Sequence, residues 1–397
     1  MTPTVSREVI VHPASHPLPS VGVLSTYPPT ACGLATFAAA LTGGLRVVGV
    51  DRIGVVRVSD GAIASADPNV VAHLRSGSPA SQRAAQRALE QFDCAVIQHE
   101  FGIFGGSDGE EILDVMAGLS VPAITTLHTV PLKPTPRQRH VLEAVVHLSA
   151  AAVTMTETAR SRLFTDYNVD PRKVTTIPHG ATLPIGALHQ TGAASPSTTP
   201  PTVLTWGLLG PGKGIEHAID AMALVRRLVP TARYVVAGRT HPKVVARDGE
   251  SYREMLVRKT HDLGLDGAVD FDDRYRSVED VVRMAAVASC IVLPYDSTDQ
   301  TTSGVLVDAV AAGRPIVATE FPHAVELLGR GCGIVVPHRS PSSLAAAIAH
   351  VLTRPEDAKL MELAAHEAAL EHHWPAVAAS YARLALHVQP AKAATCG

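Results

Sequence analysis

Residues 299–319, DQTTSGVLVDAVAAGRPIVAT, form the stretch from which the fold of the whole chain can be inferred. The apolar run 305–312 has the length of a short helix, and Gly313 with Pro315 behind it marks where a helix ends. Residues 316–318, Ile-Val-Ala, have the composition of a short buried strand. The stretch therefore predicts one helix-and-strand unit of an α/β sheet, with a polar loop before the helix.

The polar loop and the first helical turn carry the groups of a nucleotide site. Backbone N–H groups at Ser303, Gly304 and Val305 would be free at a helix N-terminus, where the helix dipole favours a phosphate. Asp308 lies about one turn inside the helix, where a carboxylate suits the two hydroxyls of a ribose. Gln300 lines the same loop. The alternative is an ordinary α/β unit with a polar helix cap, and this stretch alone does not separate the two interpretations.

The same stretch resembles the Glu-x7-Glu signature of the retaining glycosyltransferases of family four. Gln300 stands in the place of the first Glu, Asp308 in that of the second, and Ser303 where a Gly is usual. The resemblance implies an α/β chain of the GT-B type, in which two Rossmann-like domains face each other across a cleft and a nucleotide-diphosphate sugar is the donor. It implies that Asp308 holds the ribose, whereas Gln300 keeps hydrogen-bonding capacity near the donor sugar without the charge.

Length and composition limit the class of protein. A chain of 397 residues, 46% of them hydrophobic, is long enough for two cored domains. A net charge of −3, 4% aromatic residues and the absence of a long basic run argue against nucleic acid as the main partner. Five cysteines without a CxxC pair indicate neither a disulfide framework nor a zinc site.

The sequence also limits the expected location of the protein. It begins without the apolar core of a signal peptide and contains no apolar run of about 18 residues. A soluble protein of the cytoplasm is therefore expected. Peripheral membrane contact is not favoured, since no basic amphipathic helix stands out.

Strand and helix signals alternate along the first half, which predicts a parallel sheet with crossover helices. Buried strands are expected at residues 21–25, 94–97 and 122–127. The first runs into a Pro/Gly loop that contains Gly33, the second ends in His99 and Glu100, and the third ends in His128. Ligands of open α/β sheets bind at the carboxyl ends of the strands, so these four residues are candidates by position.

The family resemblance gives these four residues separate roles. It places Gly33 near the donor phosphate and the acceptor, and it brings His128 to the donor sugar. His99 and Glu100 are expected on the acceptor side. The alternatives are structural ones, because a lone His more often belongs to a core and Gly33 could belong to a plain strand-to-helix turn.

The second half opens with a Gly-rich loop at residues 207–214. It matches the start of a Walker A motif, but Gly214 replaces the Ser or Thr that would hold magnesium. The loop better resembles the phosphate loop of the family's second domain, with Lys213 as the phosphate lysine. Leu208 occupies the place of a usual Arg, so Arg239 is expected to supply a further cation for the donor.

Residues 270–272 spell Asp-Phe-Asp, the metal motif of the other main glycosyltransferase fold. The motif lies in the second of two α/β domains rather than in a single-domain metal-dependent scaffold, so we interpret it as a chance match. The resemblance instead gives Phe271, with Arg274 and Tyr275, a contact to the nucleotide base. No metal ion and no cofactor are expected.

The turn Ile-Pro-His-Gly at residues 177–180 resembles the one that closes the family's N-terminal domain. A Ser/Thr/Pro-rich segment follows and is typical of an exposed linker and hinge. The resulting expectation is an acceptor-binding domain, a linker, a nucleotide-sugar-binding domain and a terminal helix that crosses back to the first domain, at residues 1–187, 188–201, 202–373 and 374–397.

Together these features predict a metal-independent hexosyltransferase that acts with retention of configuration. The donor would be of the GDP-mannose or UDP-glucose type, with mannose slightly favoured, and the acceptor a hydroxyl of a saccharide or small polyol. His128, Lys213 and Gln300 are the predicted catalytic residues. Two alternatives remain: a nucleotide-sugar-binding protein without transferase activity, and a phosphorylase or epimerase on the same fold.

Overall fold

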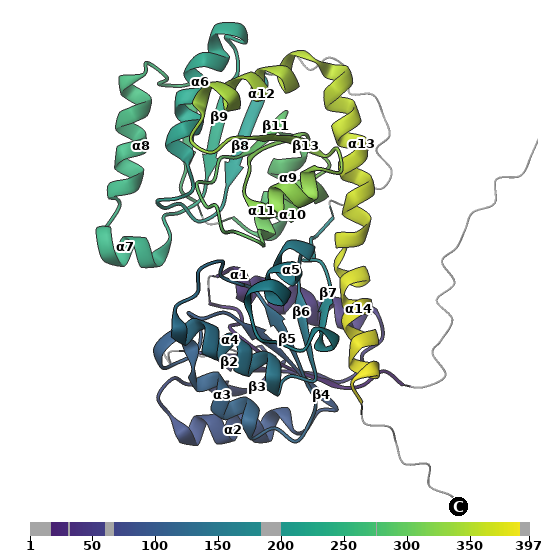
Figure 1. Cartoon of the computed structure of the whole chain (residues 1–397). Helices are drawn as coiled ribbons and strands as arrows, with labels where there is room; N and C mark the ends of the chain where they lie inside the picture. The colour runs from purple at the N-terminus through teal and green to yellow at the C-terminus, as the bar shows by residue number, and fades with distance from the viewer. Residues whose placement is uncertain (1–16, 31, 60–66, 184–199, 275, 390–397) are drawn as a thin grey trace, which may run out of the picture.

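The computed structural model describes residues 17–30, 32–59, 67–183, 200–274 and 276–389. These residues form two α/β domains, one above the other in Figure 1, each built on a single all-parallel sheet. The predicted linker at 188–201 lies outside the described residues except for its last two positions. No helix of the described ranges is long and apolar enough to cross a bilayer.

The first domain contains a seven-stranded sheet in the order β3-β2-β1-β4-β5-β6-β7. Its strands are β1 (Val21–Ser25), β2 (Ile53–Val58), β3 (Val70–Leu74), β4 (Cys94–His99), β5 (Ala123–Leu127), β6 (Ala151–Thr154) and β7 (Val174–Thr176). The helices are α1 (Gly33–Val47), α2 (Pro79–Leu89), α3 (Glu111–Ala117), α4 (Pro136–Leu148) and α5 (Glu157–Asp166). The strand order reverses between β1 and β4, and such a switch point is where open α/β sheets bind ligands.

The second domain repeats this plan with six strands in the order β10-β9-β8-β11-β12-β13. Its strands are β8 (Thr202–Trp206), β9 (Arg233–Ala237), β10 (Val269–Asp272), β11 (Cys290–Leu293), β12 (Ile316–Thr319) and β13 (Gly333–Val336). The helices are α6 (Ile215–Leu228), α7 (Pro242–Asp248), α8 (Ser251–Asp262), α9 (Val278–Ala286), α10 (Gly304–Ala311), α11 (Pro322–Leu328), α12 (Pro341–Thr353) and α13 (Pro355–His372). The predicted α/β architecture of two Rossmann-like domains is confirmed.

Helix α14 (Trp374–His387) returns the chain to the first domain, where Figure 1 shows it beside the lower sheet. Its buried face joins the core formed by β1, β4 and α1. A Cβ at Gly44 of α1 would lie 2.9 Å from the Cβ of Ala378, so the two helices approach at a point where only Gly fits. The hydroxyls of Tyr381 and Thr126 lie 2.9 Å apart and join α14 to β5.

Two glycines set the ends of the helices that carry the site. Gly313 has a φ of +67° just after α10, as expected for a helix stop. Gly214 precedes α6 with a φ of +64°, and a Cβ there would lie 1.8 Å from the carbonyl oxygen of Pro294. A Ser or Thr is therefore excluded at this position by the backbone, which removes the Walker A interpretation on structural grounds.

Candidate active site

The loops at the carboxyl ends of the two sheets face each other. The Asp299 carboxylate, in the loop after β11, accepts hydrogen bonds from the backbone N–H of Leu132, in the loop after β5, at 3.1 and 3.2 Å. The Nζ of Lys243, at the start of α7, lies 3.4 Å from where a Cβ of Gly102 would be. These contacts place the ends of both sheets on one cleft between the domains.

Lys213 lies on the second-domain side of this cleft. Its Nζ lies 4.2 Å from the centroid of the Tyr295 ring, a cation–π contact. Burial lowers the pKa of Lys213. Burial raises the pKa of Tyr295, and a hydrogen bond between its hydroxyl and Ser303 offsets only part of that rise. Tyr295 therefore joins the predicted phosphate lysine to the N-terminus of α10, and the sequence analysis did not single it out.

The N-terminus of α10 has two backbone N–H groups without an acceptor in the described part of the chain. These belong to Gly304 and Val305, as predicted. The expectation that the N–H of Ser303 is also free was wrong, because it donates to Nδ1 of His323 at 2.8 Å. The hydroxyl of Ser303 caps the helix by accepting from the N–H of Leu306.

Asp308 is the acid of this site. It lies on α10 three and four residues after Val305 and Gly304, so the three share one face of the helix. Burial raises the pKa of Asp308 to about 7. No hydrogen bond or ion pair to its carboxylate occurs among the described residues. An acid in such a place accepts hydrogen bonds strongly once a ligand with hydroxyl groups arrives.

Gln300 is held in the loop that leads to α10. Its side-chain Nε2 donates to the backbone carbonyl oxygen of Thr302 at 3.1 Å. Its backbone carbonyl oxygen accepts from the backbone N–H of His323 at 3.3 Å. Its side-chain oxygen has no partner within the described ranges. His323 thus fixes this loop at two points, through Gln300 and Ser303, and is a residue that the sequence did not indicate.

A second cation approaches the cleft from α7. The pKa of His241 is lowered by burial first and then by the charges of Lys243 and Lys213, so both ammonium groups lie near this imidazole. Arg239 is exposed, and its Nε donates to the carbonyl oxygen of Asp273 at 3.1 Å. Lys243 follows the carboxyl end of β9, as His128 follows that of β5, so its place after a strand is the sequence signal for it.

Phe271 is partly buried and packs against the core formed by β9, α6 and α8. The acids on either side of it are engaged by arginines. Asp270 pairs with Arg233 at 3.1 Å, and Asp272 pairs with Arg274 at 3.0 Å and with Arg276. The hydrogen bond from Arg274 is the main cause that lowers the pKa of Asp272. Tyr275 lies outside the described residues.

Among the described residues, one group of three side chains has the spacing of a metal site, namely Glu216, His217 and Asp296. Arg339 lies 3.3 Å from the Asp296 carboxylate, and the hydroxyl of Tyr252 donates to Glu216 at 2.7 Å. A cation and a hydroxyl thus already engage two of the three candidate ligands.

The first-domain side of the cleft contains His128 and Glu100. His128 Nε2 lies 2.6 Å from Oε1 of Gln98, and the ring meets Phe37 edge-on at 5.0 Å. Burial lowers the pKa of His128 to about 3. Glu100 accepts from the Thr129 hydroxyl at 2.5 Å, and burial raises its pKa.

His99 does not reach the cleft surface in this structure. Strand β4 extends through this residue, and the side chain is fully buried against Phe101. Neither ring nitrogen has a partner among the described residues, and burial lowers the pKa to about 4. The expected acceptor contact by His99 is therefore not supported by this geometry, whereas Glu100 is only partly buried.

Gly33 is the exposed first residue of α1, and nothing lies within 4 Å of where its Cβ would be. His179 is a first-domain residue that lies against α10 of the second domain. A Cβ at Gly304 would lie 3.0 Å from Nε2 of His179, while Nδ1 lies 2.7 Å from the carbonyl oxygen of Gly180. The available signal was the Ile-Pro-His-Gly turn, which was interpreted only as the end of a domain.

Comparison with known proteins agrees with this arrangement. Residues 31–183 match the model of Glycosyltransferase Family 4, and residues 200–354 match that of the Glycosyl transferases group 1. No curated protein matches the sequence.

Solved structures share the fold at low identity. HepE of Anabaena in complex with UDP is 16% identical, with a TM-score of 0.73 over 93% of this chain and 100% of that one. A glycosyltransferase of Rickettsia africae is 12% identical, with a TM-score of 0.73 over 94% and 99%. Sucrose-phosphate synthase of Thermosynechococcus elongatus is 16% identical, with a TM-score of 0.73 over 93% and 99%. The chain therefore carries, in order, matches to two glycosyltransferase domain models on a GT-B fold.

Proposed function

We propose that this glycosyltransferase moves a hexose from a nucleotide-diphosphate sugar to a hydroxyl of a saccharide or small polyol, with retention of configuration. One observation carries the proposal: Lys213 contacts Tyr295, which bonds Ser303 at the start of α10, and the free N–H groups of Gly304 and Val305 on this helix share a face with the unpartnered carboxylate of Asp308. The first two features suit a diphosphate and the last suits a ribose. The second domain thus offers complementary groups to both halves of a nucleotide.

The proposed reaction breaks the bond between the anomeric carbon and the diphosphate oxygen. The acceptor oxygen attacks from the same face, and its proton passes to the leaving phosphate oxygen. Lys213 and Lys243 stabilise the charge that grows on the diphosphate, the kind of term that dominates such catalysis. Neutral His128 donates or accepts a hydrogen bond at the sugar, and Gln300 orients the sugar. This arrangement places no step on a metal ion.

For the donor, we place UDP-glucose ahead of GDP-mannose. The support is that HepE was crystallised with UDP and with UDP-glucose, and that its fold covers almost the whole of this chain. This reverses the slight preference for mannose that the sequence suggested. Phe271 and Arg239, at the ends of β10 and β9, are the proposed neighbours of the base.

The test compares four ligands: UDP, GDP, UDP-glucose and GDP-mannose. Thermal shift first ranks binding, and calorimetry then measures the dissociation constants for the wild type and for Gln300→Glu. We expect one diphosphate and its sugar to bind, with nearly equal affinity in the two proteins, because Gln300 contacts the sugar side. If none of the four binds, the nucleotide site is wrong.

A second candidate function is nucleotide-sugar binding without transfer. It is favoured by the neutral Gln300 and by Leu208 in the place of a cation. Incubating the radiolabelled donor that binds best with a panel of saccharides and polyols separates the two functions. Label in a larger product supports transfer, whereas tight binding with neither transfer nor hydrolysis supports the binding protein.

A further inference from the structure

Helix α5 of the first domain contacts two segments of the second domain. The first contact involves Arg162, which is 8% exposed. Its Nη1 donates to the carbonyl oxygen of Val130 at 2.6 Å and pairs with the carboxylate of Asp299. The same carboxylate accepts from the N–H of Leu132 at 3.1 Å. Asp299 therefore ties the loop that contains Gln300 to the loop that follows β5.

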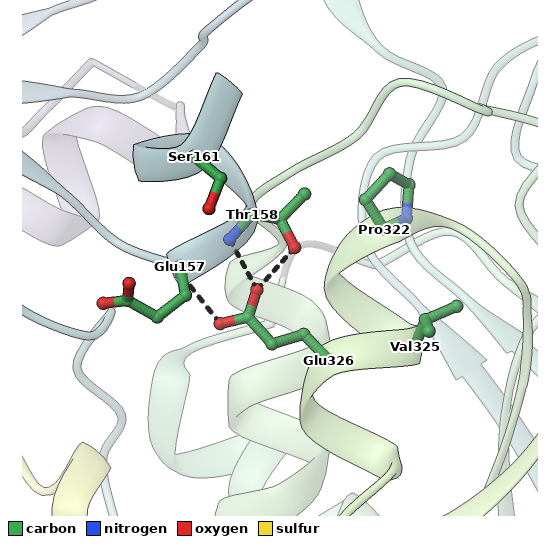
Figure 2. Close-up of a pocket in the computed structure, with 6 residues that line it drawn as sticks. All are labelled: Glu157, Thr158, Ser161, Pro322, Val325 and Glu326. Atoms are coloured by element: carbon green, nitrogen blue, oxygen red, sulfur yellow. Dashed lines mark hydrogen bonds between the residues drawn. The ribbon is translucent and has the colours of Figure 1, made fainter. Parts of the chain in front are cut away.

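The second contact lies at the N-terminus of α5. Glu326 of α11 accepts from the N–H groups of Glu157 and Thr158, both at 2.9 Å, and from the Thr158 hydroxyl at 2.6 Å. Figure 2 shows the carboxylate of Glu326 pointing directly at this helix end. A carboxylate at a helix N-terminus gains from the helix dipole and from charge-assisted hydrogen bonds.

The domains meet here through the hydrogen bonds of Glu326 to the start of α5. A cavity of about 600 Å³ lies beside the contact and is lined by both domains: Glu157, Thr158, Ser161, Pro322, Val325 and Glu326. Because space remains around the carboxylate, Glu326 can be altered without disturbing a packed core.

His323 joins the two contacts within the second domain. It lies on α11 three residues before Glu326, and it binds both Gln300 and Ser303 of the loop that carries Asp299. Because His323 belongs to α11, a shift of α11 against the first domain also moves this loop and the start of α10. Asp299 and Glu326 therefore belong to one connected unit of the second domain, which consists of the loop 299–303 and α11.

We propose that Asp299 and Glu326 are positioning residues that set the donor loop, residues 299–303, against the first domain when the domains are together. The proposal rests on the function proposed above. The groups assigned to the nucleotide all belong to the second domain, so nucleotide binding does not need these two carboxylates. Transfer does need them, because Gln300 must be aligned with an acceptor on the first domain.

The experiment measures turnover, the KM of donor and acceptor, and the affinity for the nucleotide diphosphate in Asp299→Asn, Glu326→Gln and the double variant. Both changes keep shape and remove charge. We expect kcat to fall about 10-fold in each single variant, the scale of a hydrogen bond to a charged group, while nucleotide affinity stays within about threefold. Glu320→Gln is the matched control, since Glu320 is an exposed acid just before α11.

Two results would overturn the proposal. One is a double variant with wild-type kcat. The other is a loss of nucleotide affinity equal to the loss of kcat, which would mean that the second domain itself was damaged. X-ray scattering without ligand adds a direct readout, because the double variant should have a larger radius of gyration than the wild type. The proposed function fails separately, if the wild type neither binds a nucleotide diphosphate nor transfers a sugar.

Discussion

The two sides of the cleft differ in charge. The second-domain side presents the ammonium groups of Lys213 and Lys243 and two free N–H groups at the start of α10. The first-domain side presents His128 and His179, whose pKa values burial lowers to about 3 and about 4, so both rings are neutral at physiological pH. Charge is thus concentrated where a diphosphate would lie.

This difference in charge suits two separate tasks, the binding of a diphosphate by the second domain and the binding of an acceptor by the first. A dianionic group is best held by cations and helix N-termini, which also stabilise it as it leaves. A neutral acceptor hydroxyl needs hydrogen-bonding partners without a competing charge. The predictions below test the division from the second-domain side, beginning with the largest expected effect.

Removing the main cation should abolish most of the turnover. Lys213→Ala should lose about 10²-fold or more in kcat, the scale for one donor that stabilises transition-state charge. Lys359→Ala, which removes a lysine paired with Glu362 on α13, is the control for a lost charge elsewhere. Steady-state kinetics with a saturating acceptor measures both. Turnover within about threefold of the wild type would remove Lys213 from the mechanism.

Removing the acid should weaken binding rather than chemistry. Asp308→Ala should bind the nucleotide diphosphate about 10- to 100-fold less tightly, since hydrogen bonds to a charged group contribute about 1.5–3 kcal/mol. A deoxyribose nucleotide should show a similar loss with the wild type and little further loss with the variant. Calorimetry decides, and equal affinity of variant and wild type would mean that α10 does not hold the ribose.

The pH dependence of binding should report Asp308 directly. Its pKa is raised to about 7 by burial, and only the ionised carboxylate accepts hydrogen bonds from both ribose hydroxyls. Affinity for the sugar nucleotide should therefore increase as pH rises through 7, by about tenfold between pH 6 and pH 8. The sugar nucleotide is used because its phosphates do not titrate in this range. A profile that stays as steep in Asp308→Asn would assign the titration to another group.

Chelation should have the smallest effect. Cations on the second-domain side already balance the diphosphate, so activity should survive excess EDTA at close to its starting value. Asp270 and Asp272 are each paired with arginine, which supports this expectation. Loss of activity with EDTA and its return with manganese would instead assign a metal role to these acids or to the cluster around Asp296.

The fold followed from the sequence because its signals are local. Buried parallel strands are short apolar runs, and Val21–Ser25 was predicted with its observed bounds. Helix α10 was displaced by only one residue, since Gly313 marks its end with a φ that favours Gly.

The site followed only in part, because side chains that meet from different elements leave no local signal. Gly304 could be placed, since a helix N-terminus is visible in the sequence. The contacts of Tyr295 with Lys213 and of His323 with Ser303 depend on how β11 and α11 pack. His99 was predicted to face the cleft but is buried. Strand β4 ends two residues later than the predicted 94–97, so the imidazole lies in the core.

The return of α14 to the first domain also orders events during synthesis. The N–H of Ala181 donates to the carbonyl oxygen of His372 at 2.6 Å, where the outgoing and the returning chain pass each other. The apolar face of α1, with Phe37 against Trp374, therefore gains its cover only after more than three hundred further residues have been made. At ribosomal rates this is a delay on the order of tens of seconds. During that time the second domain is synthesised, and its own core closes only with Ala365 and Ala368 of α13, directly before α14 begins, so both domains complete their cores at the end of synthesis.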